Sequence, residues 1–515
     1  MVEIVSNEPY NTRAATLMKN ALPIRAGTRF RRRIANPEGH YRLALIILSI
    51  VTFIHLLSLP LVASYDGMEY IHLANLAFTR SFASAWNYLR TPGFPSALKL
   101  AFFLGGEQPQ AAMMITSLAG VAGVLLTGSV VRTVAGNTAG AITLLVLTFY
   151  PVLVCYEHML LSETGIFFFL ALLVWLLVRS RAQAQPSGGS LPVLLACTTA
   201  LGYYWRPTII YLSPVIALGY LLLVYLPSES FRPYREFWSN IQKQPSRAVR
   251  NFVIIALGPP LLAYPWIHLS NQHPTTAPLE TITNGMYKQI LVPPSDPVNA
   301  PLRTQYEAII QQDTPKGRLP LDGLSIVGEG RYAFIKRLSA VYIQAGLLKL
   351  IAAHPGRYVA GVTRAFIHFL GVPHHVPDDE NWQFSHYVFQ LWSPGQNFPH
   401  VPGWISDLKQ FEPKPYGGGA FIGRLFGVLN PLYIPFVLLS SLVSLWWFLA
   451  ALREGNATGL IMTGIPLAFL FLHSLTMMAA TRYGFPVYPL MIANCVTLAS
   501  LAIRGWVNKR MPDTL

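Results

Sequence analysis

The stretch SETGIFFFLALLVWLLVRSR, residues 162–181, decides the class of this protein. Its centre is an unbroken apolar run that follows Glu163 and ends before Arg179 and Arg181. A helix that crosses a bilayer needs about 20 predominantly apolar residues, and basic residues collect at its cytoplasmic end. The stretch therefore predicts a transmembrane helix over 163–178 whose arginine-bearing end lies inside the cell.

Nine other apolar runs follow the same pattern, at 43–63, 111–131, 138–155, 190–204, 207–226, 251–267, 428–451, 457–478 and 485–503. With the N-terminus inside, the cytoplasmic segments hold basic residues such as Arg132, Arg247 and Arg453, whereas the opposite turn at 156–162 holds none. This asymmetry is the one that orients membrane proteins. We therefore predict an α-helical polytopic membrane protein, a bundle of about ten transmembrane helices with both termini in the cytoplasm.

Composition agrees with this class. Of 515 residues, 52% are hydrophobic and only 12% are charged, about half the charged fraction of a soluble protein. The net charge of +15 comes from basic clusters between apolar runs, so we do not expect nucleic-acid binding. The polar first 40 residues indicate no cleavable signal peptide. The three cysteines, Cys155, Cys197 and Cys495, have no metal-site or disulfide spacing.

Four segments follow from this pattern: a basic cytoplasmic N-terminus (1–40), a transmembrane module with a first outer loop at 64–110 (41–267), an extracytoplasmic region (268–425) and C-terminal transmembrane helices (426–515). Within the extracytoplasmic region, 347–371 is apolar enough to suggest another span. Arg357 and Arg364 would each cost about 2.5–3.5 kcal/mol in the bilayer. We expect an amphipathic helix in the interface instead.

Carboxylates at the outer boundary are the first candidates for chemistry. Asp66, Glu69 and Tyr70 have i, i+3, i+4 spacing, so they share one face of a predicted helix that continues through Ala74 and Phe78. A partly desolvated carboxylate is a natural general base, but Asp is also a preferred N-cap, and spacing alone does not separate these interpretations. Glu163 begins a span at the same boundary, where helix capping again competes with function.

Three arginines also lie at outer ends of predicted spans, where orientation rules do not favour a cation. Arg90, Arg206 and Arg482 each lie within two residues of an aromatic residue and within four residues of a proline. Each side chain could snorkel to lipid headgroups, or it could bind a phosphate through two charge-assisted hydrogen bonds. As a set they favour a phosphate site.

Other polar clusters carry less information. HHVPDDE (374–380) supplies imidazoles and carboxylates but matches no ligand spacing, so we interpret it as a solvated loop and predict no metal site; a divalent metal is possible but not indicated. Glu157 and His158 lie in a short turn and could be surface residues. No nucleotide-binding P-loop or dinucleotide fingerprint is present.

Five stretches together resemble the GT-C superfamily of glycosyltransferases that use polyprenyl-phosphate sugars, in particular its protein O-mannosyltransferase and aminoarabinose-transferase branch. They are YDGMEYIHLA (65–74), LRTPGFPSAL (89–98), the segment 150–177 with its Tyr-Pro start and its Leu-Ser-Glu at 161–163, WRPTIIYLSPVIAL (205–218) and the weaker TRYGFPVYPLM (481–491). Each stretch alone is loose. Their order and their placement on one predicted membrane side make the resemblance specific.

The resemblance implies an inverting transferase in the plasma (inner) membrane with its site facing the exterior or periplasm. The expected partners are a polyprenyl-phosphate-linked sugar donor, a glycan, lipid or protein acceptor, and membrane lipids, with no cofactor. By position, Asp66 is the expected base and Arg90 the phosphate ligand. Many members carry an acidic residue directly after the aspartate, and here that position is Gly67. Either Glu69 or Glu163 supplies a second carboxylate, or none is needed.

Two other functions remain open. A flippase or transporter of lipid-linked sugars would show internal repeats and ionisable residues at mid-span, and no clear repeat is present. A transferase of the O-antigen-ligase type would share the donor but not the early Asp and Pro-Gly turn. Release of polyprenyl phosphate from a donor separates transfer from transport.

Overall fold

The computed structural model describes residues 37–58, 91–106, 109–182, 190–226, 233–272, 347–370, 419–476 and 484–510, together with Gly67, Tyr70, Leu73 and Ala74. Nearly all of these residues are helical, and no β-strand occurs among them. In chain order the helices are α3 (Pro37–Ser58), α6 (Gly93–Gly105), α7 (Pro109–Thr148), α8 (Pro151–Glu157), α9 (Glu163–Ala182), α10 (Ser190–Trp205), η1 (Pro207–Leu212), α11 (Ser213–Tyr225), α12 (Pro233–Lys243), α13 (Pro245–Gln272), α17 (Leu347–Ala353), α18 (Pro355–Phe369), α20 (Gly419–Glu454), α21 (Ala457–Thr476), η5 (Phe485–Val487) and α22 (Tyr488–Arg510).

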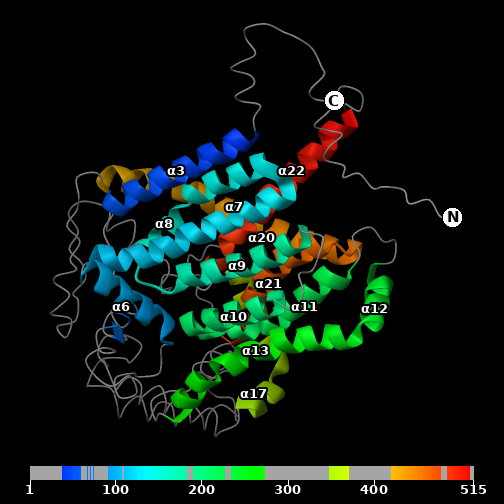
Figure 1. Cartoon of the computed structure of the whole chain (residues 1–515). Helices are drawn as coiled ribbons and strands as arrows, with labels where there is room; N and C mark the ends of the chain where they lie inside the picture. The colour runs from blue at the N-terminus through cyan, green and yellow to red at the C-terminus, as the bar shows by residue number, and fades with distance from the viewer. Residues whose placement is uncertain are drawn as a thin grey trace.

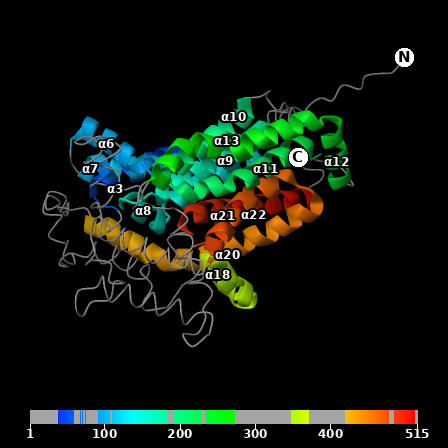
Figure 2. The same ribbon diagram turned by 90° about the horizontal axis from the view of Figure 1, so that it is seen from below.

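The long helices lie side by side in one bundle, with α6 and α8 toward one end and α12 toward the other in both views (Figures 1 and 2). α9 and α21 are the most buried of the long apolar helices, and α3 is the most exposed. Exposed leucine, isoleucine and phenylalanine side chains cover the outside of α3 and α13. A bundle that is apolar both inside and outside is the form expected in a bilayer.

Eight helices of the described chain are long and apolar enough to cross a membrane, compared with the ten predicted. The difference lies in two places. α10 covers the predicted span 190–204 but has only 16 residues. α7 covers two predicted spans, because the chain turns back at Gly136, where φ is +83°. Gly128 and Leu144, on the two arms, are in contact. The protein is therefore the predicted helical polytopic type, and each predicted run overlaps a helix of the described chain.

Proline sets several of the helix starts. Pro151, Pro207, Pro233 and Pro245 occupy the first positions of α8, η1, α12 and α13. Proline is favoured there because its fixed φ suits a helix and its missing N–H would have no helical partner anyway. These residues divide the apolar sequence into separate helices and fix where the polar turns between them fall.

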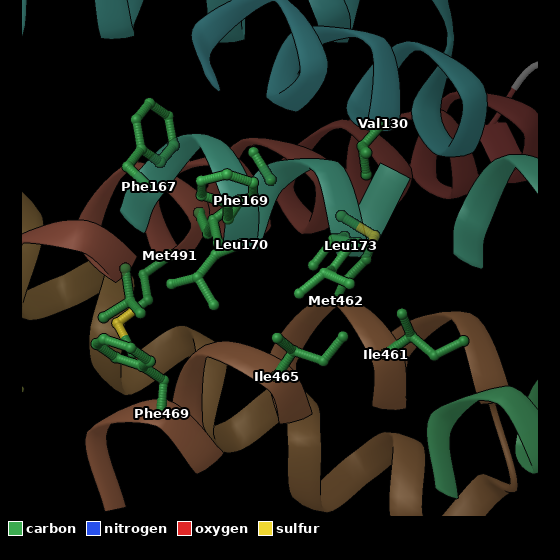
Figure 3. Close-up of a cluster of buried hydrophobic side chains, with 14 of the residues drawn as sticks. Val130, Phe167, Phe169, Leu170, Leu173, Ile461, Met462, Ile465, Phe469 and Met491 are labelled. Carbon is green, nitrogen blue, oxygen red and sulfur yellow. The ribbon is translucent and has the colours of Figure 1, made fainter. Parts of the chain in front are cut away.

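The core lies where α7, α9, α21 and α22 meet (Figure 3). α9 contributes aromatic and branched side chains, α21 faces it, and α7 and α22 close the remaining sides. The buried side chains at this contact include Val130, Phe167, Phe169, Leu170, Leu173, Ile461, Met462, Ile465, Phe469 and Met491. This packing fixes the position of α9, and hence of Glu163 at its first residue.

The segment predicted as one interfacial helix at 347–371 consists of two helices, α17 and α18, separated at His354. α18 packs against α21, and the Tyr358 hydroxyl donates to the Leu475 carbonyl at 2.8 Å. Arg357 and Arg364 are exposed, and α18 is too short to be a candidate span. The break before Pro355 follows from the missing N–H of proline. Most of the predicted extracytoplasmic region 268–425 lies outside the described residues.

Candidate active site

The centre of the candidate site is a buried ion pair between two of the predicted site residues. Nη1 of Arg206 lies 2.7 Å from Oε1 of Glu163, and their side chains are only 14% and 2% exposed. Residue 163 is the first of α9, and residue 206 lies between α10 and η1. A charge-assisted hydrogen bond at this depth is stronger than one on a wet surface. The structure thus brings together one candidate carboxylate and one candidate phosphate ligand.

The local sequence explains how Arg206 reaches Glu163. Arg206 has an extended backbone (φ −153°, ψ 128°) and precedes Pro207. A residue before proline is driven out of the helical region by the proline ring. α10 therefore ends at Trp205, and the arginine side chain leaves the helix instead of continuing its face.

Ser162 joins the pair to its surroundings through hydrogen bonds from three other side chains. Its hydroxyl accepts from Nη1 of Arg206 at 3.1 Å and from the Tyr70 hydroxyl at 3.5 Å. Its carbonyl accepts from Nε1 of Trp205 at 3.0 Å. Ser162 is fully buried. These bonds link the first outer loop, the start of α9 and the end of α10 at one point.

The second carboxylate oxygen of Glu163, Oε2, is buried and has no hydrogen-bond partner in the part of the chain that the structure describes. Nearly all buried polar groups in proteins are hydrogen-bonded, and leaving one without a partner costs about 1–3 kcal/mol. The oxygen is therefore an acceptor available to a bound hydroxyl or other donor.

Four of the predicted site residues lie outside the described residues: Asp66, Glu69, Arg90 and Arg482. Described residues close to them in the chain contact the segments that precede Glu163 and Arg206. A Cβ added to Gly67 would be 2.7 Å from the Leu160 carbonyl oxygen, and one added to Gly93 would be 2.5 Å from that of Tyr204. The Phe485 ring stacks on Tyr156 with centroids 3.8 Å apart. Three segments distant in sequence thus abut residues 156–160 and 204.

Described residues of the first outer loop follow the predicted spacing. Tyr70 and Ala74 are buried together against α6, with the Tyr70 ring edge-on to Phe94 at 4.8 Å between centroids. Phe78, expected on the same face, lies outside the described residues.

A second polar cluster lies beside the site and was missed in the sequence. Nδ1 of His55 lies 2.8 Å from Nε2 of His158, and Nε2 of His55 lies 3.3 Å from Oε2 of Glu157. All three residues are buried, so the interpretation of Glu157 and His158 as surface residues was wrong. Burial raises the pKa of the Glu157 carboxyl well above its ordinary value. The cluster fastens the end of α3 to the turn that precedes Glu163.

His473 is a further residue that sequence reasoning missed. It lies near the end of α21, where its Nδ1–H donates to the Phe469 carbonyl at 3.0 Å, and it interacts electrostatically with Arg206. His55 and His473 shared one signal, since each is an ionisable side chain inside a run predicted to span the membrane.

The described residues contain no group of three His, Cys, Asp or Glu side chains that could hold a metal ion. The HHVPDDE segment lies outside them, so its interpretation as a solvated loop stays a prediction.

The comparisons with known proteins agree with the sequence motifs. Residues 90–232 match the family model described as dolichyl-phosphate-mannose-protein mannosyltransferase. No curated protein matches the chain. Among solved structures, ArnT from Cupriavidus metallidurans bound to undecaprenyl phosphate shares 14% identity at a TM-score of 0.36, over 92% of this chain and 80% of ArnT.

The Archaeoglobus fulgidus oligosaccharyltransferase tethered to an acceptor peptide shares 10% identity at a TM-score of 0.42, over 92% of this chain and 51% of that one. With identities and TM-scores this low, neither structure serves as a template for the site. The family match covers residues that carry Arg206, Glu163 and three of the five quoted motifs. The match confirms the predicted resemblance over residues 90–232, in a protein whose described residues include eight helices long and apolar enough to cross a membrane.

Proposed function

We propose that this protein is an inverting glycosyltransferase that moves a sugar from a polyprenyl-phosphate donor to an acceptor hydroxyl on the outer face of the membrane. The observation that carries the proposal is the buried Glu163–Arg206 pair at one end of the bundle. It sets a cation and a carboxylate acceptor side by side in a water-poor environment, and phosphate departure with hydroxyl attack requires both.

Arg206 serves the leaving group in this proposal. As the bond between the anomeric carbon and the phosphate oxygen breaks, its electron pair moves to the phosphate, and nearby cations stabilise the growing charge. A guanidinium presents N–H donors in a planar fork that matches phosphate oxygens, and Nη1 of Arg206 donates to both Ser162 and Glu163. We propose that Arg90 and Arg482 bind the same phosphate.

Carboxylates serve the acceptor. We propose that the oxygen of the acceptor hydroxyl attacks the anomeric carbon from the face opposite the phosphate, and that Asp66 takes the proton of this hydroxyl. Glu163 Oε2, which has no hydrogen-bond partner among the described residues, would accept a hydrogen bond from a sugar or acceptor hydroxyl. Glu69 is the other candidate for this second carboxylate role.

The contacts of Gly67 and Gly93 support a shared site, since the residues next to them carry the proposed base and one proposed phosphate ligand. Gly67 follows Asp66 directly and lies against Leu160. Gly93, three residues after Arg90, lies against Tyr204 and Trp205. A base and phosphate ligands that act on one bond must stand within a few ångströms of it, and the contacts of Gly67 and Gly93 support such an arrangement.

The distribution of charge supports an outer-face site. α9 begins and α10 ends at the same end of the bundle, where the Glu163–Arg206 pair lies. The arginine-bearing ends of the helices lie at the opposite end. At those basic ends lie Arg132, Arg179, Arg181, Arg247, Arg250, Arg453 and Arg504. Because cytoplasmic ends collect Lys and Arg, the pair would face the exterior.

The test uses the purified full chain in detergent with a panel of polyprenyl-phosphate hexoses and pentoses and a cell-envelope extract as the source of acceptor hydroxyls, and it measures released polyprenyl phosphate. We expect release with at least one donor. Asp66→Asn should lower turnover about 10²–10⁴-fold, the usual effect of losing a general base, with donor KM little changed. Arg206→Lys should raise donor KM, because lysine keeps the charge but loses the planar fork.

Arg453→Lys is the matched control, since Arg453 is exposed at the opposite end of the bundle, and it should behave as the unaltered protein. Normal turnover in Asp66→Asn would reduce that residue to a helix cap. If no donor releases polyprenyl phosphate and labelled donor instead crosses proteoliposome membranes intact, the protein is a transporter.

A further inference from the structure

The end of the bundle opposite the Glu163–Arg206 pair carries a short amphipathic helix, α12, between α11 and α13 (Figures 1 and 2). α12 is held in place from within: Phe237 is buried, and Nδ2 of Asn240 donates to the Tyr225 carbonyl at 3.2 Å. The Tyr234 hydroxyl donates to the Leu452 carbonyl. Trp238 points outward and is 62% exposed. An exposed tryptophan beside a polar turn is typical of a membrane interface.

Two arginines in the first turns of α13 have only neutral partners in the described chain. Nη1 of Arg247 donates to Oε1 of Gln244 at 3.3 Å, and Nε of Arg250 donates to Oδ1 of Asn251 at 3.4 Å. Neither arginine forms an ion pair with a described carboxylate. Two cations one helical turn apart, without an acidic partner, repel each other unless an anion lies between them.

The buried Tyr225 side chain lies near these two arginines. The Tyr225 hydroxyl is buried and has no hydrogen-bond partner among the described residues, and Tyr225 as a whole is 5% exposed. The charges of Arg247 and Arg250 both act on Tyr225 and on the neighbouring Tyr220. The Tyr220 hydroxyl differs in having a partner, because it accepts from Nδ2 of Asn251 at 3.0 Å. Two guanidinium groups thus lie near one O–H donor that has no partner among the described residues.

The surface next to these arginines indicates what kind of anion would fit. Arg250, Val253 and Leu257 have i, i+3, i+7 spacing, so they share one face of α13. Val253 and Leu257 are 43% and 54% exposed. A free phosphate would not contact this apolar stripe, whereas the acyl chain of a phospholipid whose phosphate lies at Arg250 would pack along it.

We propose that Arg247, Arg250 and the Tyr225 hydroxyl form a binding site for the phosphodiester of an anionic phospholipid, with Trp238 at the level of its glycerol backbone. The site lies at the end of the bundle opposite the Glu163–Arg206 pair, so it stands independently of the proposed transferase activity. Anionic lipid is favoured over zwitterionic lipid because a headgroup amine would add a third positive charge beside the two arginines.

The test measures thermal unfolding of the purified full chain in neutral detergent micelles as phosphatidylglycerol or phosphatidylcholine is added. We expect phosphatidylglycerol to raise Tm with saturation, and phosphatidylcholine to have a much smaller effect. Each basic residue beside an anionic lipid changes affinity roughly fivefold, so the Arg247→Gln/Arg250→Gln double variant should need about 25-fold more phosphatidylglycerol for half of the shift.

Arg235→Gln is the matched control, because Arg235 is an exposed arginine on α12 that does not act on Tyr225, and it should keep the half-saturation value of the unaltered protein. Tyr225→Phe removes only the hydroxyl and should raise that value about fivefold. An unchanged value in the double variant would overturn the proposal. So would an equal shift with phosphatidylcholine, or an equal shift with millimolar inorganic phosphate, which would assign the site to a free anion.

Discussion

Trp205 holds the candidate site together at the level of single residues. Its Nε1–H donates to the Ser162 carbonyl at 3.0 Å, and its ring lies 5.2 Å from Phe94 and 6.0 Å from Phe169 between centroids. The ring covers the backbone of Gly165, where there is no space for a Cβ beside Nε1. The absence of a side chain at position 165 therefore lets the indole approach α9 and place Arg206, the next residue, beside Glu163.

This arrangement predicts that Gly165→Ala damages the site although it adds a single methyl group. The new Cβ must displace the Trp205 ring, which is packed between two phenylalanines, and overpacking of this kind costs about 1–3 kcal/mol. We expect a lower Tm and a higher donor KM, since Arg206 would move with Trp205. Thermal unfolding and the polyprenyl phosphate release assay measure the two effects.

Gly219→Ala in α11 is the matched control. A Cβ at Gly219 would meet only Leu177 at 3.7 Å and Ile461 at 3.9 Å, which are ordinary contacts. Alanine is the better helix former by about 1 kcal/mol, so this variant should keep or slightly raise Tm and keep donor KM. Equal behaviour of the two variants would show that the Trp205 contact does not fix the site.

The sequence predicted Glu163 and Arg206 as separate candidates, because each lies at an outer span boundary where a charge is unexpected. It could not predict that they pair. The pairing depends on how α9 packs against α10 and on the extended conformation before Pro207, and residue spacing does not report interhelical distance. The roles of His55 and His473 were hidden for a similar reason, since a lone histidine in an apolar run has no visible partner in sequence.

At the scale of elements, the most informative feature is the reversal inside α7. Gly136 has φ +83° and ψ 175°, a region that is essentially restricted to glycine. Arg504 from α22 donates to the Ala135 carbonyl beside it, which satisfies one carbonyl at the end of the first arm. The sequence predicted two spans here from the basic residue Arg132 and the run lengths, and the structure joins them through one glycine.

Gly136→Ala should therefore destabilise the whole bundle. Alanine at this φ and ψ costs about 1–3 kcal/mol, and its Cβ would also collide with the Arg504 guanidinium. The measurement is Tm of the purified chain against that of Gly356→Ala, a substitution on α18 that meets no atom within 4 Å. If the two variants unfold at the same temperature, the turn is flexible enough to accept a side chain.

Helix existence was predictable, whereas helix boundaries were not. Twenty apolar residues must form a helix in a bilayer because every backbone group needs an internal partner, and hydropathy reports this directly. The break between α17 and α18, and the short α8 and η1, depend on proline positions and on packing against other helices. Run length contains neither kind of information.

For the whole molecule, the two ends of the bundle differ in chemistry. One end carries the Glu163–Arg206 pair and the buried His55–Glu157–His158 cluster. The other carries α12 and the arginines at the ends of α9, α13, α20 and α22. The sequence predicted this division from the alternation of basic and neutral connections along the chain. The assignment of ends to cell compartments stays a prediction.

Cysteine labelling of two exposed positions tests that assignment. Ser239 on α12 and Thr363 on α18 are both exposed, and α18 contacts the end of α21 that carries His473 through the Tyr358–Leu475 hydrogen bond. In a chain with Cys155, Cys197 and Cys495 replaced, Ser239→Cys should react with a membrane-impermeant maleimide only in inside-out vesicles. Thr363→Cys should react only in intact cells. The physical reason is that moving the basic end across the membrane would transfer several arginines against both the positive-inside preference and the membrane potential.

The reversed labelling pattern would set the Glu163–Arg206 pair at the cytoplasmic face and move the proposed transfer reaction there. Labelling of both positions from one side would contradict the single predicted span, in α13, that separates α12 from α18.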